Sequence, residues 1–328
     1  MQSVATDVAA LLAGFFFLAK GAHWLVEGGA ELARRWGISP LMVGLTVVAW
    51  GTSMPEVVVS TFAAADGRAG VALGNVLGSN VANIGLVLGL SAFILPAVLT
   101  GRISRRFTVS LFVALGALWF VCSDSAVTRI EAFGLLAVFA AYNLMLYFAP
   151  GDSQTAELES SGQEAESHRQ RWPWLLVLIG SAAIAGAAEL VMYGAENIFI
   201  RAGFSETVVG LTVVAVGTSL PELAAGVGSA LKKQSEISVG NVIGSNVFNC
   251  LAVIGVAAAV RPFEMTTPQA ISDMDAALGR DFPINLAFAI LLLVVPIVAR
   301  RRFGRFKGAL LLAAGLGYMA YLLIDGRP

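Results

Sequence analysis

The chain is poor in the residues that soluble proteins carry on their surfaces. Only 13% of its 328 residues are charged and 57% are hydrophobic, whereas an ordinary soluble domain is roughly 25% charged. Its 21 basic and 22 acidic residues leave no positive excess for binding nucleic acid. The mean hydropathy is +0.78. This composition argues against a soluble enzyme, a secreted disulfide scaffold and a nucleic-acid-binding protein, and favours an integral membrane protein.

The chain also has few soft metal ligands, with two cysteines and two histidines. Cys122 and Cys250 lie in apolar runs, where a free thiol usually behaves as a small buried hydrophobe. Two cysteines in separate spans give no reason to expect a disulfide. His23 lacks metal-ligand spacing and His168 lies in a polar stretch. We therefore expect no disulfide, no zinc or copper site and no cofactor.

Apolar runs of transmembrane length recur almost from end to end. Breaks at charged and Gly/Pro clusters predict an all-α membrane protein with ten transmembrane helices. The ten predicted spans cover residues 5–27, 39–64, 71–98, 107–123, 129–149, 173–198, 206–231, 237–260, 282–299 and 307–324. The first run is not preceded by the basic stretch of a signal peptide, so we expect it to be a retained span. Residues 261–281 are too polar to span, and the sequence leaves open an outer loop or an interfacial helix.

A polar, acidic stretch from 151 to 172 divides the chain into two units of five spans, 1–150 and 173–328. It is too short to form a regulatory domain and is typical of a solvated linker. The two units repeat one another. Residues 43–56 read VGLTVVAWGTSMPE and residues 209–222 read VGLTVVAVGTSLPE, which differ at two of fourteen positions with an offset of 166. At the same offset, residues 74–83 read GNVLGSNVAN and residues 240–249 read GNVIGSNVFN. Since each unit has an odd number of spans, we predict an inverted repeat.

The distribution of Lys and Arg predicts the orientation, because these residues accumulate in cytoplasmic loops. With the N-terminus outside, the inner loops hold Arg34, Arg35, Arg102, Arg105, Arg106, Arg169, Arg171, Lys232, Lys233, Arg300, Arg301, Arg302, Arg305 and Lys307. The outer side then holds only Arg68, Arg129, Arg201, Arg261, Arg280 and Arg327. This asymmetry favours both termini outside and the acidic linker inside.

Both repeats place polar groups inside apolar spans. Glu56 and Glu222 are central, since an ionisable side chain there costs ~2.5 to 3.5 kcal/mol and usually has a function. On a helix, each Glu shares one face with residues three, four and seven positions before it. These are Ser53, Thr52 and Ala49 in the first repeat and Ser219, Thr218 and Ala215 in the second. A Gly before each Thr-Ser pair and a Pro before each Glu predict a discontinuous helix with free backbone carbonyls.

The third and eighth spans carry matching polar stripes with a spacing of four residues. The stripes are Asn75, Ser79 and Asn83 in one repeat and Asn241, Ser245 and Asn249 in the other. Carboxylate, hydroxyl, amide and carbonyl oxygens are the hard donors that calcium prefers, in cages of six to eight ligands. If the two Glu meet, their repulsion at ~4 Å amounts to several kcal/mol and requires a cation or a proton. For Asn75 and Asn241, an interhelical hydrogen bond explains the pattern as well as ligation does.

The paired GTSxPE and GNxxGSNxxN blocks resemble the alpha repeats of the sodium/calcium exchanger family, and are most similar to its compact prokaryotic members. The resemblance implies ion ligation by Glu56, Glu222, Thr52, Ser53, Thr218, Ser219, Ser79, Ser245 and the carbonyls of Ala49 and Ala215. We expect Asn83 and Asn249, one turn further on, to act as ligands too. The resemblance further implies alternating access, in which spans 5–27 and 173–198 slide across the remaining helices.

The expected function is therefore antiport of calcium against sodium, with the bilayer and inorganic cations as the only required partners. Some family members carry Asp where this chain has Asn83 and Asn249, so the resemblance implies no obligatory potassium. The short linker implies no calcium-sensing domain. Calcium/proton exchange remains open, because protons can also neutralise the two Glu. A channel would need a continuous pore, and an intramembrane enzyme would use the two Glu as acid and base. We expect a prokaryotic plasma membrane as the location.

Overall fold

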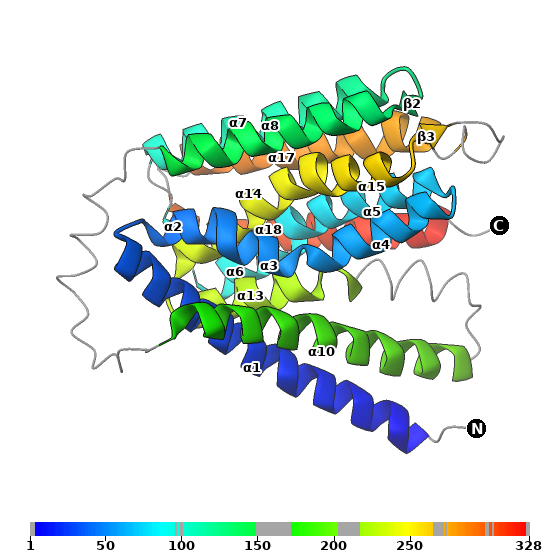
Figure 1. Ribbon diagram of the computed structural model, residues 1–328. Helices are drawn as coiled ribbons and strands as arrows, with labels where there is room; N and C mark the ends of the chain where they lie inside the picture. Colours follow the sequence, from blue (N-terminus) through cyan, green and yellow to red (C-terminus); the bar gives the residue numbers. More distant parts are fainter. Residues whose placement is uncertain are drawn as a thin grey trace.

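The computed structural model describes residues 4–95, 97–98, 101–148, 172–202, 217–264, 272, 274–298, 302–303 and 305–325, and these are largely helical (Figure 1). The first half contains α1 (Val4–Trp36), α2 (Pro40–Val43), η1 (Gly44–Val48), α3 (Ala49–Thr52), α4 (Met54–Ala65), α5 (Ala69–Ala82), η2 (Asn83–Leu88), α6 (Gly89–Ile94), α7 (Gly101–Cys122) and α8 (Arg129–Tyr147). The second half contains α10 (Pro173–Arg201), α13 (Leu220–Leu231), α14 (Ser235–Phe248), η4 (Asn249–Val253), α15 (Ile254–Val260), η5 (Ala277–Asp281), α17 (Phe282–Val298) and α18 (Arg305–Asp325). The η segments are π-helical turns within longer helices.

Two short antiparallel strand pairs connect the halves. β1 (Ala97–Val98) pairs with β4 (Arg302–Phe303), and β2 (Ala126–Val127) pairs with β3 (Phe263–Glu264). The undecided stretch 261–281 thus contains a strand, and its last residues form η5, which continues directly into α17.

Among the described residues, five helical stretches are long and apolar enough to cross a membrane. They are Val4–Trp36, Ala69–Ile94, Arg129–Tyr147, Pro173–Arg201 and Ser235–Val260. A sixth candidate joins Pro40–Thr52 to Met54–Ala65 through a bend of 46°. Two predicted segments lie mostly or partly outside the described residues. Of the predicted linker only residue 172 is described, and the predicted span 206–231 is described from residue 217 onward.

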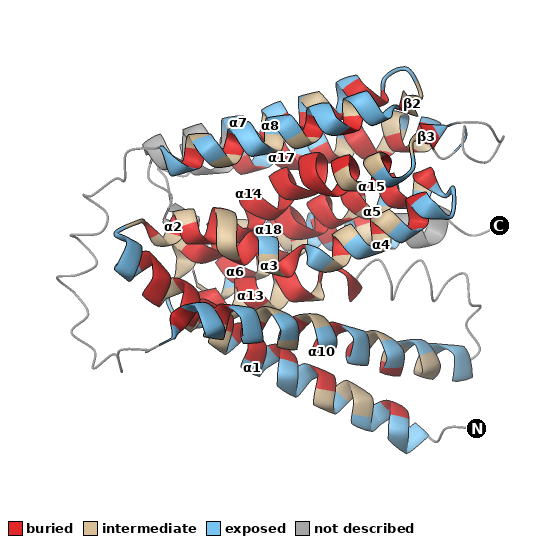
Figure 2. Ribbon diagram, in the orientation of Figure 1, coloured by how far each residue is buried: buried red, intermediate tan, exposed pale blue. Residues whose placement is uncertain are grey.

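The repeated polar blocks lie on the most deeply buried helices. Of the most apolar stretch in Ser235–Val260, 89% is buried within the protein, against 22% in α8. Figure 2 shows this gradient, with α14 and α15 buried at the centre and α7 and α8 largely exposed along one side. Exposed apolar side chains on peripheral helices are expected of a protein whose solvent is lipid.

The helices α1 and α10 pack side by side along the opposite side of the molecule (Figure 1). Their contact contains glycines, so the backbones approach closely. A Cβ atom added at Gly21 would lie 2.9 Å from the Gly180 carbonyl oxygen, and one added at Gly180 would lie 2.6 Å from the Leu25 nitrogen. Buried side chains of both helices belong to a hydrophobic cluster separate from the main core.

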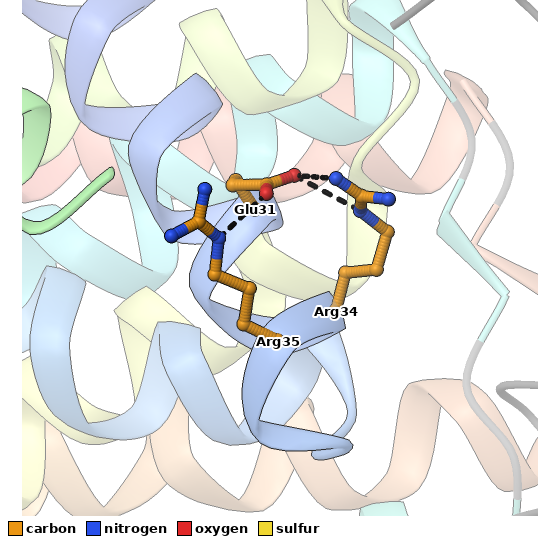
Figure 3. A network of polar contacts seen from close by, with 3 residues as sticks. All are labelled: Glu31, Arg34 and Arg35. Carbon is orange, nitrogen blue, oxygen red and sulfur yellow. Dashed lines mark hydrogen bonds and ion pairs between the residues drawn. The ribbon is translucent and has the colours of Figure 1, made fainter. Parts of the chain in front are cut away.

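Charged residues lie in the last turns of α1, where the helix leaves the apolar region. Glu31 is buried and accepts hydrogen bonds from Arg34 and Arg35, whose Nε atoms lie 2.9 and 2.8 Å from its carboxylate oxygens (Figure 3). Cations in the last turn also favour the negative end of the helix dipole. Glu31 is therefore neutralised within its own helix and is not available to the central site.

Candidate cation-binding site

The site begins at the bend in the second predicted span. α3 ends at Thr52, Ser53 leaves the helical conformation with φ −89° and ψ 9°, and α4 begins with Pro55 in its first turn. Glu56 follows in the same turn and is fully buried. Proline lacks the N–H that continues a helix, so the helix restarts at this point. A carboxylate in a first turn lies at the positive end of the helix dipole.

The second repeat has the same local structure at Ser219, with φ −89° and ψ 0°, followed by α13. Glu222 lies in the first turn of α13, after Pro221, and is also fully buried. The two helix starts are thus equivalent in sequence, backbone conformation and burial. The bend at Ser53 follows a Gly and precedes a Pro, as the sequence predicts, and Gly217 and Pro221 flank Ser219 in the same way.

Contacts between the repeats bring the two carboxylates into one site. Ser53 Oγ donates a hydrogen bond to Glu222 Oε1 at 2.8 Å, across 169 residues of chain. Ser79 Oγ on α5 lies 3.4 Å from Glu56 Oε1, and Ser245 on α14 lies beside Glu222 in the equivalent position. Glu56 and Glu222 are near enough to repel each other when both are ionised. Two buried, like charges of this kind require a neutralising cation or a proton.

The threonines of the two breaks make reciprocal contacts with the other repeat. Thr52 Oγ1 lies 3.2 Å from Asn241 Oδ1, and Thr218 Oγ1 lies 3.3 Å from Asn75 Oδ1. Asn75 and Asn241 therefore form the interhelical hydrogen bonds that the sequence left as one of two explanations. Thr52 Oγ1 is also 3.3 Å from the Ala49 carbonyl oxygen, which accepts the Ser53 N–H at 3.0 Å. This carbonyl therefore lies at the bend, but it is not free of hydrogen bonds, whereas the sequence predicts a free carbonyl. The equivalent Ala215 lies outside the described residues.

The last residues of the polar stripes are also joined across the repeats. Asn83 Nδ2 donates to Asn246 Oδ1 at 3.0 Å, and Asn249 Nδ2 donates to Asn80 Oδ1 at 3.1 Å. Sequence reasoning missed Asn80 and Asn246 because each follows the middle serine of its stripe by one residue, which puts it on another face of the helix. A signal was present, since both belong to the repeated GSN triplet at the common offset of 166.

Several buried oxygen atoms of the site have no hydrogen-bond partner. They are Glu56 Oε2, Glu222 Oε2, Ser219 Oγ, Ser245 Oγ, Asn83 Oδ1 and Asn249 Oδ1. A buried polar atom without a partner costs free energy unless a ligand satisfies it. No described group of three or more His, Cys, Asp and Glu side chains is able to hold a metal ion. The oxygens here come instead from two carboxylates and several neutral groups, a donor set that suits calcium and sodium.

The fully buried carboxylate of Asp7 lies outside this site and was not predicted. Asp7, near the start of α1, is fully buried and pairs with Arg201 at the end of α10, with 3.0 Å between Arg201 Nε and Asp7 Oδ2. Asp7 belongs to no repeat or motif, so the sequence carries no signal for it. Its ion pair joins the two peripheral helices at one end.

Fold and site together define an integral membrane transporter of metal cations. A model of the family described as sodium/calcium exchanger protein matches residues 6–148 and 172–324. The chain therefore belongs to the sodium/calcium exchanger family. This confirms the resemblance of the repeated motifs, and it excludes the enzyme alternative because the family consists of transporters.

Relatives and solved structures agree with this assignment. The chain is 38% identical over 323 residues to the Alkalimonas amylolytica protein named as the antiporter CaxA, covering 96% of this chain and 98% of the relative. It is 29% identical to the sodium/calcium exchanger MaX1 of Methanosarcina acetivorans, covering 96% and 97%. A solved structure of the sodium-calcium exchanger NCX_Mj, soaked with Na⁺ and Sr²⁺, superposes with a TM-score of 0.79 at 28% identity, covering 97% and 99%. Together they support antiport involving calcium and a second cation.

Proposed function

We propose that this chain exchanges calcium for sodium by alternating access, at one site shared by the two repeats. The ligands in this proposal are Glu56, Glu222, Thr52, Ser53, Thr218, Ser219, Ser79, Ser245, Asn83, Asn249 and the carbonyls of Ala49 and Ala215. The two carboxylates together balance one calcium ion. Sodium ions bind the same oxygens in the other half of the cycle, so the two substrates compete.

The observation that carries the choice of sodium is the set of unpartnered neutral oxygens. Ser219 Oγ, Asn83 Oδ1 and Asn249 Oδ1 are buried without partners, beside two carboxylates that each keep one unpartnered oxygen. A proton would neutralise a carboxylate and leave these neutral oxygens unsatisfied. A sodium ion needs several neutral oxygens around it, so a site built in this way favours sodium over a proton.

Calcium/proton exchange is the second candidate, because each of Glu56 and Glu222 is able to bind a proton. The name of the relative CaxA specifies an antiporter without a coupling ion. A channel is disfavoured, since the ligands from both halves meet within one chain and need no pore assembled around an oligomer axis.

The peripheral helices α1 and α10 are suited to be the part of the protein that moves during alternating access. The two helices contact each other through glycines, and much of their buried surface belongs to a separate hydrophobic cluster. Sliding of this pair across the remaining helices would expose the site to one side of the membrane at a time. Figure 1 shows α1 beginning and α18 ending at the same end of the molecule, which fits ten spans in two inverted units. We place both termini outside a prokaryotic plasma membrane, with the linker inside.

The proposal includes three expected absences. Asn83 and Asn249 supply amides where some family members have a carboxylate, so potassium is not required. The linker is too short for a calcium-sensing domain. No cofactor or further protein is needed, and the bilayer and the transported ions are sufficient partners.

Reconstitution into vesicles tests the coupling ion. Vesicles loaded with sodium are diluted into sodium-free medium that contains radiolabelled calcium, and parallel vesicles receive only a proton gradient. We expect calcium uptake with the sodium gradient and none with the proton gradient. Uptake with the proton gradient alone would replace sodium by protons as the coupling ion. Absence of calcium uptake under both gradients would contradict the proposal as a whole.

A further inference from the structure

Four fully buried asparagines join the two repeats next to the carboxylates. We propose that two of them, Asn80 and Asn246, are positioning residues that hold the amides of Asn249 and Asn83 with their oxygens turned to the cation. The inference rests on the proposed function, because it assigns a ligand role to Asn83 and Asn249. It adds two residues whose own side chains face other protein groups.

The direction of each hydrogen bond carries the argument. Asn83 Nδ2 donates to Asn246 Oδ1 and Asn249 Nδ2 donates to Asn80 Oδ1, at 3.0 and 3.1 Å. Each of these bonds occupies the nitrogen of the ligand amide and leaves its oxygen unpartnered. An amide turned by 180° would instead present an N–H group, which cannot bind a cation.

The orientation of the two positioning amides is fixed in turn by their own nitrogens. Asn246 Nδ2 donates to the Asn80 carbonyl oxygen at 3.2 Å, and Asn80 Nδ2 lies 3.2 Å from the sulfur of Cys250. The Asn80 carbonyl oxygen can only accept, so a turned Asn246 would lose this contact as well as its contact with Asn83. The Cys250 thiol is a weak acceptor and a weak donor, so it holds the Asn80 amide less strictly. In the arrangement that the structure shows, the nitrogens of all four amides donate, and the oxygens of Asn83 and Asn249 remain without partners.

The asparagines that carry those two oxygens lie one helical turn beyond the serines beside the carboxylates. Asn83 follows Ser79 by one helical turn, and Ser79 contacts Glu56. Asn249 follows Ser245 by one turn, and Ser245 lies beside Glu222. Residues four positions apart share one helix face. The unpartnered amide oxygens thus extend the line of oxygens that leads from the carboxylates.

A change in helix type occurs at the same place in both repeats. The α-helices α5 and α14 end before Asn83 and Asn249, and the π-helical turns η2 and η4 begin at these residues. A π turn interrupts the regular backbone ladder and is frequent at functional sites. The Asn80 carbonyl at this transition is one of the acceptors in the network. Backbone and side chains are therefore organised around the two asparagines in both halves.

The test uses the difference between an amide and a carboxylate. Asn80→Leu removes the acceptor for Asn249 but keeps the backbone carbonyl that holds Asn246. Removal of a group that orients a metal ligand typically weakens metal binding by ~10 to 100-fold, and we expect a loss of that order in equilibrium binding of radiolabelled calcium. In an Asn249→Asp background the same substitution should cause little loss, because a carboxylate presents an oxygen in either orientation. A residue that merely supports packing would not be rescued in this way.

Two controls make the test specific. In an Asn83→Asp background, Asn80→Leu should still weaken binding, because Asn83 is held by Asn246 and not by Asn80. The mirror set, Asn246→Leu with and without Asn83→Asp, gives an independent test if Asn80→Leu does not yield folded protein. Thermal unfolding of each purified variant shows whether it is folded.

The outcomes separate this inference from the proposed function. Calcium binding by the wild type, loss in Asn80→Leu and recovery only in the Asn249→Asp background support the inference. Equal losses in all three backgrounds, or undiminished binding in Asn80→Leu, overturn it and leave the calcium site in place. A wild type that binds no calcium overturns the proposed function and the inference together.

Discussion

At the scale of single residues, the site contains two carboxylates that the fold does not neutralise by itself. Glu56 and Glu222 are fully buried, and each keeps one oxygen without a hydrogen-bond partner. The hydroxyls of Ser53 and Ser79 donate to the other oxygens, but a hydroxyl supplies no charge. A bound cation supplies it, so occupancy of the site and stability of the buried pair are linked.

Glu56→Gln and Glu222→Gln should each abolish sodium-driven calcium uptake. Each substitution keeps the shape of the side chain and removes one charge, which at ~4 Å from a cation contributes about 4 kcal/mol per unit charge at an effective dielectric of 20. That energy corresponds to a roughly thousandfold weaker affinity for the cation. Radiolabelled calcium flux measures the loss, and thermal unfolding shows that the variants are folded. Glu196→Gln, at an exposed position on α10, is the matched control. Near-normal flux in either site variant would contradict the assignment of that Glu.

The sequence predicts much of this site because its residues are doubled. The common offset of 166 residues marks Glu56, its hydroxyl neighbours and their copies without any structural information. Asn80 and Asn246 share that offset, but a regular helical stripe puts them off the predicted face. Their role becomes visible only when two distant helices are placed together. Side-chain direction and hydrogen-bond partners across some 160 residues of chain cannot be derived from local periodicity.

At the scale of elements, the contact between α1 and α10 requires small residues at defined positions. The approach of the Gly180 Cα to the backbone of α1 leaves no space for a methyl group, since an added Cβ would lie 2.6 Å from the Leu25 nitrogen. Further along α10, an added Cβ at Gly186 would meet no described atom within 4 Å. The two glycines of one helix therefore have different structural roles.

Gly180→Ala should destabilise the protein and reduce exchange, because it forces the two helices apart. Overpacking of this kind typically costs 1 to 3 kcal/mol, so about 1 kcal/mol or more is expected. Gly186→Ala should be neutral or slightly stabilising, since alanine favours a helix over glycine by about 1 kcal/mol in water. Thermal unfolding and calcium flux of both variants are the measurements. Equal effects of the two substitutions would show that close approach at Gly180 is unimportant.

The ion pair between Asp7 and Arg201 should fasten the same two helices at one end. Arg201→Met leaves the fully buried Asp7 carboxylate without its cation, and breaking a buried pair in this way typically costs ~3 to 5 kcal/mol. Because Arg201 is partly exposed, we expect the free energy of unfolding to fall by ~3 kcal/mol or less. Adding Asp7→Asn to Arg201→Met should recover stability, as the unpaired charge is then removed. If the double variant is less stable than Arg201→Met, the carboxylate is not the source of the cost.

The elements differ in how well the sequence predicts them. Apolar length and charged boundaries predict long helices such as α8 and α10 to within a few residues. The bend at Ser53 follows from Gly51 and Pro55. The π-helical turns have no comparable signal, because apolar periodicity does not distinguish one extra residue in a turn from a regular α-helix. The strand pairs β1–β4 and β2–β3 are only two residues long on each side and join distant parts of the chain.

At the scale of the whole molecule, the two repeats complete one another. Pairs such as Thr52 with Asn241 and Thr218 with Asn75 are the same contact made twice, once in each direction. The two asparagine contacts show the same reciprocity. In the proposed site, each half thus supplies ligands and the other half contacts them, so neither half would hold a complete site by itself.

One site shared by two substrates predicts direct competition. Equilibrium binding of radiolabelled calcium to the purified protein, measured as sodium is raised at constant pH and ionic strength, tests this claim most directly. We predict that sodium displaces calcium with a Hill coefficient above one, because more than one sodium ion replaces each calcium, and that choline at equal concentration does not. Calcium binding that is unchanged by sodium and lost only on acidification would contradict sodium coupling and assign the exchange to protons.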